Sequence, residues 1–198
     1  MKKMMMMLFM ATVAMTASAQ KTLHENGTFT LQPKVGLAIG TLSGDWTSAS
    51  GVERKSRYGL IAGVEGEYYV NDWFSAALGV NYAQQGWKFD GSGINETTKL
   101  DYLNIPITAN FYVAEGLALK TGVQLGVLMS AKEESVDVKD AYEKTNISIP
   151  IGISYEFSNF VFDARYNLSV TKINKNSDSN NKYRSDLFQI TVGYKFAL

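Results

Sequence analysis

Apolar and polar residues alternate along most of this chain, and the alternation is clearest in residues 74–111. Within residues 74–83, Leu78 and Val80 share one face of an extended strand, and the polar or small residues between them share the other. Residues 102–111 alternate in the same way, and a segment rich in Gly, Asn and Thr lies between the two runs. Alternation with a period of two predicts half-buried strands, and two such runs around a turn-forming segment predict a β-hairpin.

Six more runs of this kind occupy the rest of the chain, at residues 29–40, 58–70, 117–130, 146–157, 160–171 and 187–196. The connections are alternately long (41–57, 88–99, 131–145 and 172–185) and short (71–73, 113–116 and 158–159). Outer-membrane barrels have an even number of antiparallel strands, with short periplasmic turns and long extracellular loops. The pattern therefore predicts an all-β fold, an eight-stranded antiparallel up-and-down transmembrane β-barrel whose first and last strands pair.

The two faces of the runs differ in composition, and this difference predicts which face meets lipid. One face is aliphatic in the middle and aromatic towards the strand ends, as in the lipid-facing band and aromatic girdles of a membrane barrel. The other face carries small and amide side chains with a few charges, which suits a narrow eight-stranded interior. A soluble lipocalin-like barrel would have the reverse arrangement, with its apolar face inward. We expect one aromatic girdle at the short-turn ends (Tyr68, Phe74, Phe111, Tyr155, Phe157, Phe160, Tyr194 and Phe196) and a second nearer the long loops (Tyr58, Tyr82 and Tyr166).

Charged residues on the polar face are the candidate functional residues of the lumen. They are Lys34, Glu65, Glu67, Lys120, Asp163 and Arg165, with Lys195 near the end of the chain. Such a set could form a conduction path or a proton relay. Ions removed from water need partners, however, and eight strands enclose barely enough room for their own side chains. The preferred interpretation is a structural ion network that fills the barrel.

The first twenty residues have the features of an export signal. Lys2 and Lys3 precede an apolar stretch, and Ala17-Ser18-Ala19 supplies the small residues of a cleavage site. We expect a signal peptide at residues 1–19, a periplasmic lead at 20–27 and one barrel domain at 28–198. Without Lys2 and Lys3 the chain has 17 basic and 19 acidic residues, so it offers no basic surface for nucleic acid.

Catalytic and metal-binding chemistry is not predicted. The single histidine, His24, lies in the expected lead, so no Ser-His or Asp-His pair can form at the outer rim. The chain has no cysteine to serve as a nucleophile or metal ligand. Acidic loop residues do not have the spacing of an EF-hand-like calcium site. The sequence therefore predicts no catalytic residues, no metal site and no cofactor.

The central hairpin contains a sequence motif that is more specific than the alternation of apolar and polar residues. Tyr82-Ala-Gln-Gln-Gly86, followed by Leu100-Asp-Tyr-Leu-Asn-Ile-Pro-Ile107, resembles a motif of the PorT-like outer-membrane β-barrel family of Bacteroidetes. Residues 122–126 and 164–166 are also similar to that family, although Asn104 stands where the family often has Glu. The resemblance implies an integral outer-membrane barrel of the porin-like class, and it supplies no catalytic residues.

Together these features favour a barrel that acts through its extracellular loops, in a structural, adhesive or accessory role. The alternative is transport, as a narrow channel or as a carrier of lipids or small molecules; a lipid-modifying enzyme is disfavoured by the missing histidine. Expected partners are outer-membrane lipid and an extracellular ligand of the long loops. The aromatic end of the last strand, Gly193-Tyr194-Lys195-Phe196, resembles the signal that the barrel-insertion machinery recognises, and is equally explained as a lipid-facing strand edge.

Overall fold

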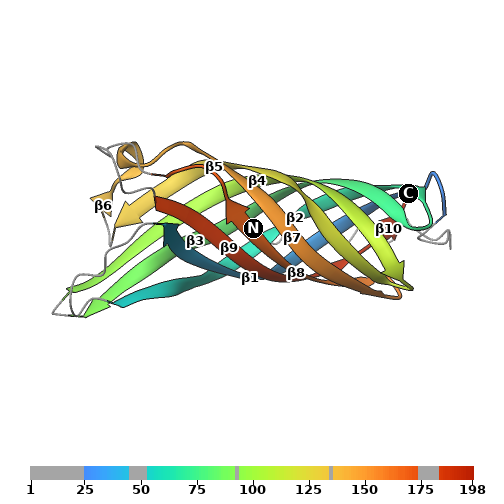
Figure 1. Cartoon of the computed structure of the whole chain (residues 1–198), viewed down its shortest axis with the longest axis horizontal. Helices are drawn as coiled ribbons and strands as arrows, with labels where there is room; N and C mark the ends of the chain where they lie inside the picture. Colours follow the sequence, from blue (N-terminus) through green and yellow to red (C-terminus); the bar gives the residue numbers. More distant parts are fainter. Residues whose placement is uncertain (1–24, 45–52, 92–93, 134–135, 174–182) are drawn as a thin grey trace, which may run out of the picture.

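The computed structural model describes residues 25–44, 53–91, 94–133, 136–173 and 183–198. They form one antiparallel sheet rolled into a barrel (Figure 1). The eight long strands are β1 (Phe29–Gly44), β2 (Glu53–Asn71), β3 (Phe74–Gly91), β4 (Ile94–Ala114), β5 (Leu117–Glu133), β7 (Thr145–Phe157), β8 (Phe160–Ser169) and β9 (Tyr183–Tyr194). The short strands β6 (Val136–Asp137) and β10 (Phe196–Ala197) and the 3-10 helix η1 (Lys139–Ala141) complete the described part, in which no helix is long and apolar enough to cross a membrane.

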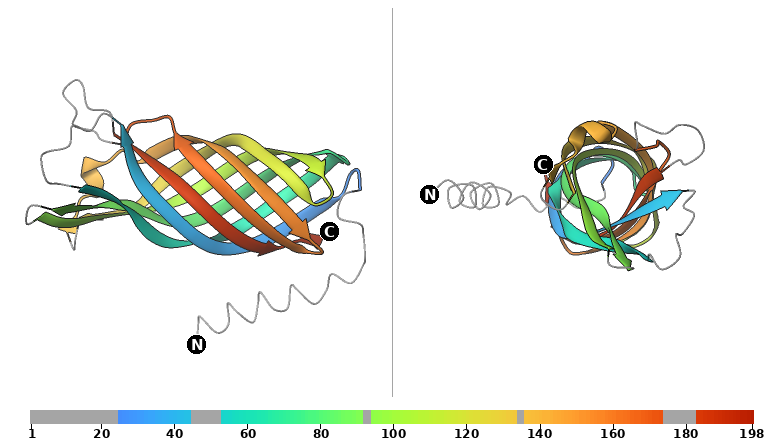
Figure 2. Two further views of the ribbon diagram at one scale, coloured as in Figure 1. Left: turned by 60° about the horizontal axis from the view of Figure 1, so that its bottom comes forward. Right: turned by 90° about the vertical axis from the view of Figure 1, so that its left-hand side faces the viewer.

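The sheet closes because its first strand pairs with its last. Neighbouring long strands pair in sequence order, and β1 also pairs with β9 from Lys34↔Gly193 to Gly44↔Tyr183. The short strand β10 continues this seam, with Leu31 opposite Phe196. The end-on view in Figure 2 shows the resulting ring of strands. The predicted eight-stranded antiparallel barrel is confirmed, including the pairing of its first and last strands.

The apolar face of each strand points outward, and the polar face points into the barrel. On β5, Leu119 and Val123 are 48% and 54% exposed, whereas Lys120 and Gln124 are 3% and 4% exposed. The same alternation holds on the other long strands. The soluble barrel with an apolar interior is therefore excluded, since in water this outer surface would be a continuous apolar patch far larger than soluble proteins carry.

Aromatic side chains gather on the outer surface at the short-turn end. The rings of Phe74 and Phe111 lie 5.4 Å apart, and those of Phe160 and Tyr194 lie 5.2 Å apart. Trp73, in the turn between β2 and β3, stacks on Phe111. These contacts join neighbouring strands into the aromatic row expected at a membrane interface.

The strands extend further towards the long-loop end than the sequence pattern predicts. β1 continues to Gly44 and β2 begins at Glu53, although residues 41–57 were predicted as a loop. β3 and β4 stay paired up to Gly91↔Ile94, so most of the predicted loop 88–99 is a hairpin that projects beyond the barrel (Figure 1). The predicted loop 131–145 contains β6 and η1, and β9 begins within the predicted loop 172–185. Apolar alternation did not reveal these segments because a strand pair beyond the membrane is held by backbone hydrogen bonds and meets no lipid.

A β-bulge in β5 corrects one further prediction. Asp101 is opposite Ser130 and Tyr102 is opposite Leu128, so Met129 is an extra residue in β5. Strict alternation from Lys120 would turn Ser130 into the lumen, but Ser130 shares the outer face with Asp101, and Ala131 is turned into the barrel, where it is fully buried. A bulge inserts one residue and reverses the alternation beyond it.

Candidate functional site

The middle of the lumen holds five charged side chains from four strands, which we call the central ion cluster. They are Lys34 on β1, Glu65 on β2, Lys120 on β5, and Asp163 and Arg165 on β8, and all are buried. Lys34 Nζ lies 2.5 Å from Glu65 Oε2, and Arg165 Nη2 lies 2.9 Å from Asp163 Oδ2. Each cation therefore has a carboxylate within reach, as charges removed from bulk water require.

Two of these side chains connect opposite walls of the barrel. Lys120 Nζ lies 3.3 Å from Glu65 Oε1 and 3.1 Å from Asp163 Oδ2, while Arg165 Nη2 lies 3.4 Å from Glu65 Oε2. Because β5 and β2 are three strands apart around the ring, the contact between Lys120 and Glu65 spans the lumen. Three cations meet two carboxylates here, so the central ion cluster has an excess positive charge.

A second group lies nearer the short turns, and we call it the lower ion cluster. Lys195 Nζ lies 2.8 Å from Glu67 Oε2, and it also pairs with Glu156 of β7. The Tyr112 hydroxyl lies 2.8 Å from both Glu67 Oε1 and Glu156 Oε1, and it contacts the Tyr69 hydroxyl at 2.9 Å. One cation meets two carboxylates, so the excess negative charge of this cluster balances the excess positive charge of the central one.

The structure places all six residues of the predicted lumen network inside the barrel, but it divides them between the central and lower ion clusters. Lys34, Glu65, Lys120, Asp163 and Arg165 are together, whereas Glu67 belongs to the lower ion cluster. Glu67 also accepts hydrogen bonds from Asn110 Nδ2, at 2.8 Å, and from the Ser75 hydroxyl. The sequence interpretation did not assign Glu156, Tyr69 or Tyr112 to the lumen network. The alternation contained the signal for Glu156, which is two residues from the lumen residue Ser154.

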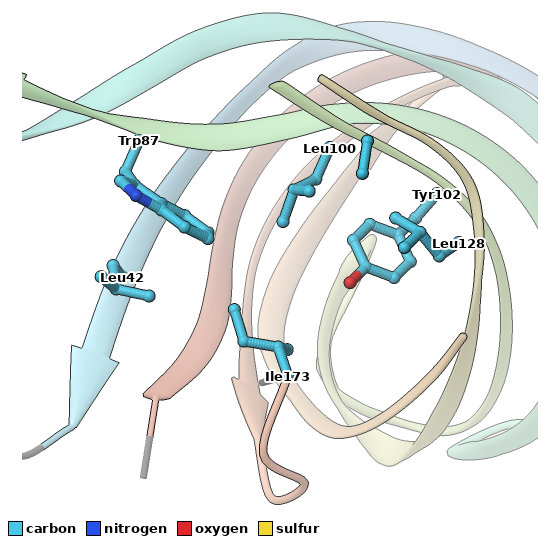
Figure 3. Close-up of a cluster of buried hydrophobic side chains, with 7 residues drawn as sticks. Leu42, Trp87, Leu100, Tyr102, Leu128 and Ile173 are labelled. Carbon is cyan, nitrogen blue, oxygen red and sulfur yellow. The ribbon is translucent and has the colours of Figure 1, made fainter. Parts of the chain in front are cut away.

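A cluster of buried apolar side chains lies in the long-loop half of the lumen (Figure 3). This upper apolar cluster consists of Leu42, Trp87, Leu100, Tyr102, Leu128, Ala131 and Ile173, each at most 4% exposed. Figure 3 shows Trp87, Leu100, Tyr102 and Ile173 turned towards one another. The sequence analysis did not identify this cluster, because it treated the inward face as uniformly polar.

The barrel is also narrow just below the upper apolar cluster. A Cβ atom added to Gly40 of β1 would lie 2.6 Å from the backbone nitrogen of Gly86 on β3. Gly86 has a φ of +131°, a conformation that only glycine adopts without strain. Ala38, Ile61, Ala83 and Leu187 fill the adjacent interior. The backbones of two strands that are not neighbours in the sheet thus approach each other at this level.

A cavity of about 290 Å³ lies at the extracellular mouth, above the upper apolar cluster. Its lining combines apolar and aromatic side chains with two carboxylates: Leu42, Trp87, Phe89, Glu96, Thr98, Glu133, Ala141, Tyr142, Ile173 and Tyr183. The Tyr142 hydroxyl donates a hydrogen bond to Glu133 Oε1 at 2.9 Å. Burial and the Glu133 carboxylate raise the pKa of Tyr142, so this hydroxyl keeps its proton at neutral pH.

Chemically, the ion pairs of the interior can hold strands of the barrel together across the lumen. Among the described residues, no group of three or more His, Cys, Asp or Glu side chains is placed to hold a metal ion. His24 and the expected signal peptide lie outside the described residues. The cavity at the mouth is one place in the described structure where a small molecule could bind.

Comparison with known proteins identifies the class to which this barrel belongs. The outer membrane protein beta-barrel domain family matches residues 18–175. None of the curated proteins shows significant sequence similarity to the chain.

Solved structures with the same fold include several outer-membrane barrels. Neisserial surface protein A is 20% identical, with a TM-score of 0.54 over 85% of this chain and 97% of that chain. Ail of Yersinia pestis, solved with the heparin analogue sucrose octasulfate, is 18% identical, with a TM-score of 0.51 over 86% of this chain and 99% of that chain. OprG of Pseudomonas aeruginosa is 14% identical, with a TM-score of 0.50 over 87% and 97%. At these identities the likeness shows the fold alone.

The family match covers more than half of the chain, and the fold and its outward apolar band agree with it. The protein is therefore located in the outer membrane. In barrels of this class the short turns face the periplasm and the long loops lie outside the cell. The chain belongs to the outer membrane protein β-barrel domain family.

Proposed function

We propose that this protein is a closed barrel that acts through its extracellular face, in an adhesive, structural or accessory role. The observation that carries the proposal is the filling of the lumen at successive levels. The lower and central ion clusters cross it, the Gly40–Gly86 approach narrows it, and the upper apolar cluster fills it below the mouth. Such an interior stabilises a scaffold and leaves the extracellular end free to bind a ligand.

The cavity at the mouth supports this role. Its aromatic and aliphatic lining suits an apolar group of an extracellular ligand, and Glu96 and Glu133 favour a ligand that also carries a positive charge or hydrogen-bond donors. The structure of Ail with a heparin analogue concerns a protein of the same fold. It is a precedent for a small outer-membrane barrel in complex with a heparin analogue, not a guide to the ligand of this chain.

The alternative function, transport through a channel, predicts discrete conductance steps in planar lipid bilayers, and the closed barrel predicts none. We expect the purified mature protein to give no discrete conductance steps, because ion pairs and apolar side chains occupy the lumen. Different gel mobilities before and after boiling would establish that the sample is a folded barrel. Discrete conductance steps from such a sample would overturn the closed-barrel proposal and favour a narrow channel.

Further parts of the proposal come from the sequence. The motifs at residues 82–86 and 100–107 support a place among the PorT-like barrels of Bacteroidetes. We also propose that residues 1–19 are a cleaved signal peptide, that 20–27 form a periplasmic lead, and that the insertion machinery recognises the end of the last strand. The absence of cysteine and the single histidine at His24 support a role other than catalysis.

A further inference from the structure

The outer wall of the barrel carries lysines in directly opposed pairs where β2 to β5 leave the aliphatic band. Lys99 on β4 is opposite Lys132 on β5, and Lys55 on β2 is opposite Lys88 on β3. All four side chains are exposed. Trp87 beside Lys88, Thr98 and Leu100 on either side of Lys99, and Ala131 beside Lys132 are buried in the barrel, so the alternation turns these three lysines to the outside.

Opposed like charges on one face of an antiparallel pair destabilise the sheet. Asp90 offsets the repulsion between Lys55 and Lys88, because its Oδ2 lies 2.6 Å from Lys55 Nζ. Neither Lys99 nor Lys132 forms an ion pair with any residue of the described ranges, and Asp101 on the same face interacts instead with Arg57 and Tyr82. Asp137 of β6 is opposite Lys132 on its other side, but it forms no ion pair with Lys132, and its Oδ1 accepts a hydrogen bond from the backbone N–H of Lys139. An anion from outside the chain would offset the repulsion that remains between Lys99 and Lys132.

The position of these lysines indicates the kind of anion. On the same outer face, the aliphatic band directly below them ends in Leu103 on β4 and in Val127 and Met129 on β5. The lysines therefore stand on the wall at the height of the lipid head groups, and not at the tips of the loops. Basic residues next to a membrane-spanning segment bind anionic head groups.

The two ends of the barrel also differ in the charge that they expose. At the short-turn end, the exposed charged side chains of the described residues are all acidic: Glu25, Asp72 and Glu115. Exposed cations are confined to the long-loop end in this part of the chain, where they lie among exposed carboxylates such as Glu96, Glu133 and Asp137, and the opposed lysine pairs are among them. This asymmetry matches an outer membrane, whose outer leaflet contains a phosphorylated glycolipid.

We propose that Lys99 and Lys132, supported by Lys55 and Lys88, bind the phosphate groups of the outer-leaflet glycolipid, lipid A. The acyl chains of the same lipid then lie against Leu103, Val127 and Met129. A shared lipid phosphate offsets the repulsion within the opposed pair, so the barrel is stabilised in its own membrane. The proposal rests on the outer-membrane location and is independent of the ligand at the mouth.

The test compares Lys99→Gln/Lys132→Gln with a matched control, Lys172→Gln/Arg184→Gln. The control removes two exposed cations at the same end, and Arg184 is opposite Ser43 and not another cation. The mature proteins are placed in phosphatidylcholine nanodiscs and titrated with lipid A, and the unfolding temperature reports binding. Removing two lysines at the height of the head groups should lower the affinity of the first variant for lipid A roughly thirtyfold. The control should keep an affinity near that of the wild-type protein. Dephosphorylated lipid A should bind the wild-type protein as weakly as lipid A binds the first variant.

A second measurement separates lipid binding from a purely structural role. In phosphatidylcholine alone, the Lys99→Gln/Lys132→Gln protein should be at least as stable as wild type, because the repulsion has been removed. Lower stability there, or wild-type affinity of this variant for lipid A, would overturn the proposal. Tighter binding of a heparin fragment than of lipid A to the wild-type protein, abolished by the same substitutions, would assign the lysines to a sulfated glycan instead. Equal competition by inorganic phosphate would reduce the site to an adventitious anion site.

Discussion

Replacing Glu65 with alanine is expected to lower the free energy of unfolding of the barrel by about 3–5 kcal/mol, the cost of leaving buried charges without a partner. Glu65 is the carboxylate that Lys34, Lys120 and Arg165 all contact. Without it, three buried cations share the single carboxylate of Asp163. Urea unfolding of the protein in phospholipid vesicles measures the difference.

Lys120→Ala is the matched control, because it removes a charge of the opposite sign from the same cluster. Lys34 and Arg165 would then face Glu65 and Asp163, so the cluster would become neutral. We expect a clearly smaller loss of stability than for Glu65→Ala. Equal losses for the two variants would show that net charge does not govern the stability of the central ion cluster.

The second large loss of stability is expected from a substitution on the lipid-facing side of the barrel. Val123→Arg should destabilise the inserted barrel by about 2–4 kcal/mol, because Val123 lies on the outer face near the middle of β5 and arginine there enters the hydrocarbon region. The same vesicle-based unfolding experiment measures this value.

Met129→Arg provides a control for depth, since Met129 is on the outer face of the same strand but nearer the extracellular end. The cost of an arginine there should fall to about 0–1 kcal/mol. A cost as large as that of Val123→Arg would contradict the assigned depth. If Lys120→Ala stabilised the inserted barrel and Val123→Arg cost nothing, the inside and outside of the barrel would be reversed.

The sequence allowed the fold to be predicted well because the membrane imposes a simple rule on each strand. Lipid requires apolar side chains at every second position, so the alternation at residues such as Leu119, Val123 and Leu125 locates strands and faces together. Where the strands leave the membrane the rule no longer applies. The paired segments around Lys55, Lys88 and Glu96 therefore resembled loops, although their backbones remain hydrogen bonded.

The interior was harder to predict, because residues on one face can be identified from alternation but their partners cannot. The sequence placed Glu65 and Glu67 in one interior network with Lys120 and Arg165, but it did not indicate that Lys120 would meet Glu65 while Glu67 would pair with Lys195. These contacts depend on strand stagger and barrel diameter, which one hairpin does not determine. The upper apolar cluster was missed for a related reason. Leu100 and Leu128 lie on the inward face, and the composition of the remaining inward residues suggested a polar lumen throughout.

The central claim is a barrel with lipid on its outer face and a filled interior, and single-cysteine spin labelling along β5 tests it most directly. The chain has no cysteine of its own, so labels at positions 119, 120, 123, 124 and 125 report one site each. In phospholipid vesicles we expect high accessibility to oxygen at Leu119, Val123 and Leu125, and low accessibility to both oxygen and a water-soluble nickel chelate at Lys120 and Gln124. Oxygen accessibility that peaks at Lys120 and Gln124 would reverse the faces, and high nickel accessibility at those two positions would show an open, water-filled lumen.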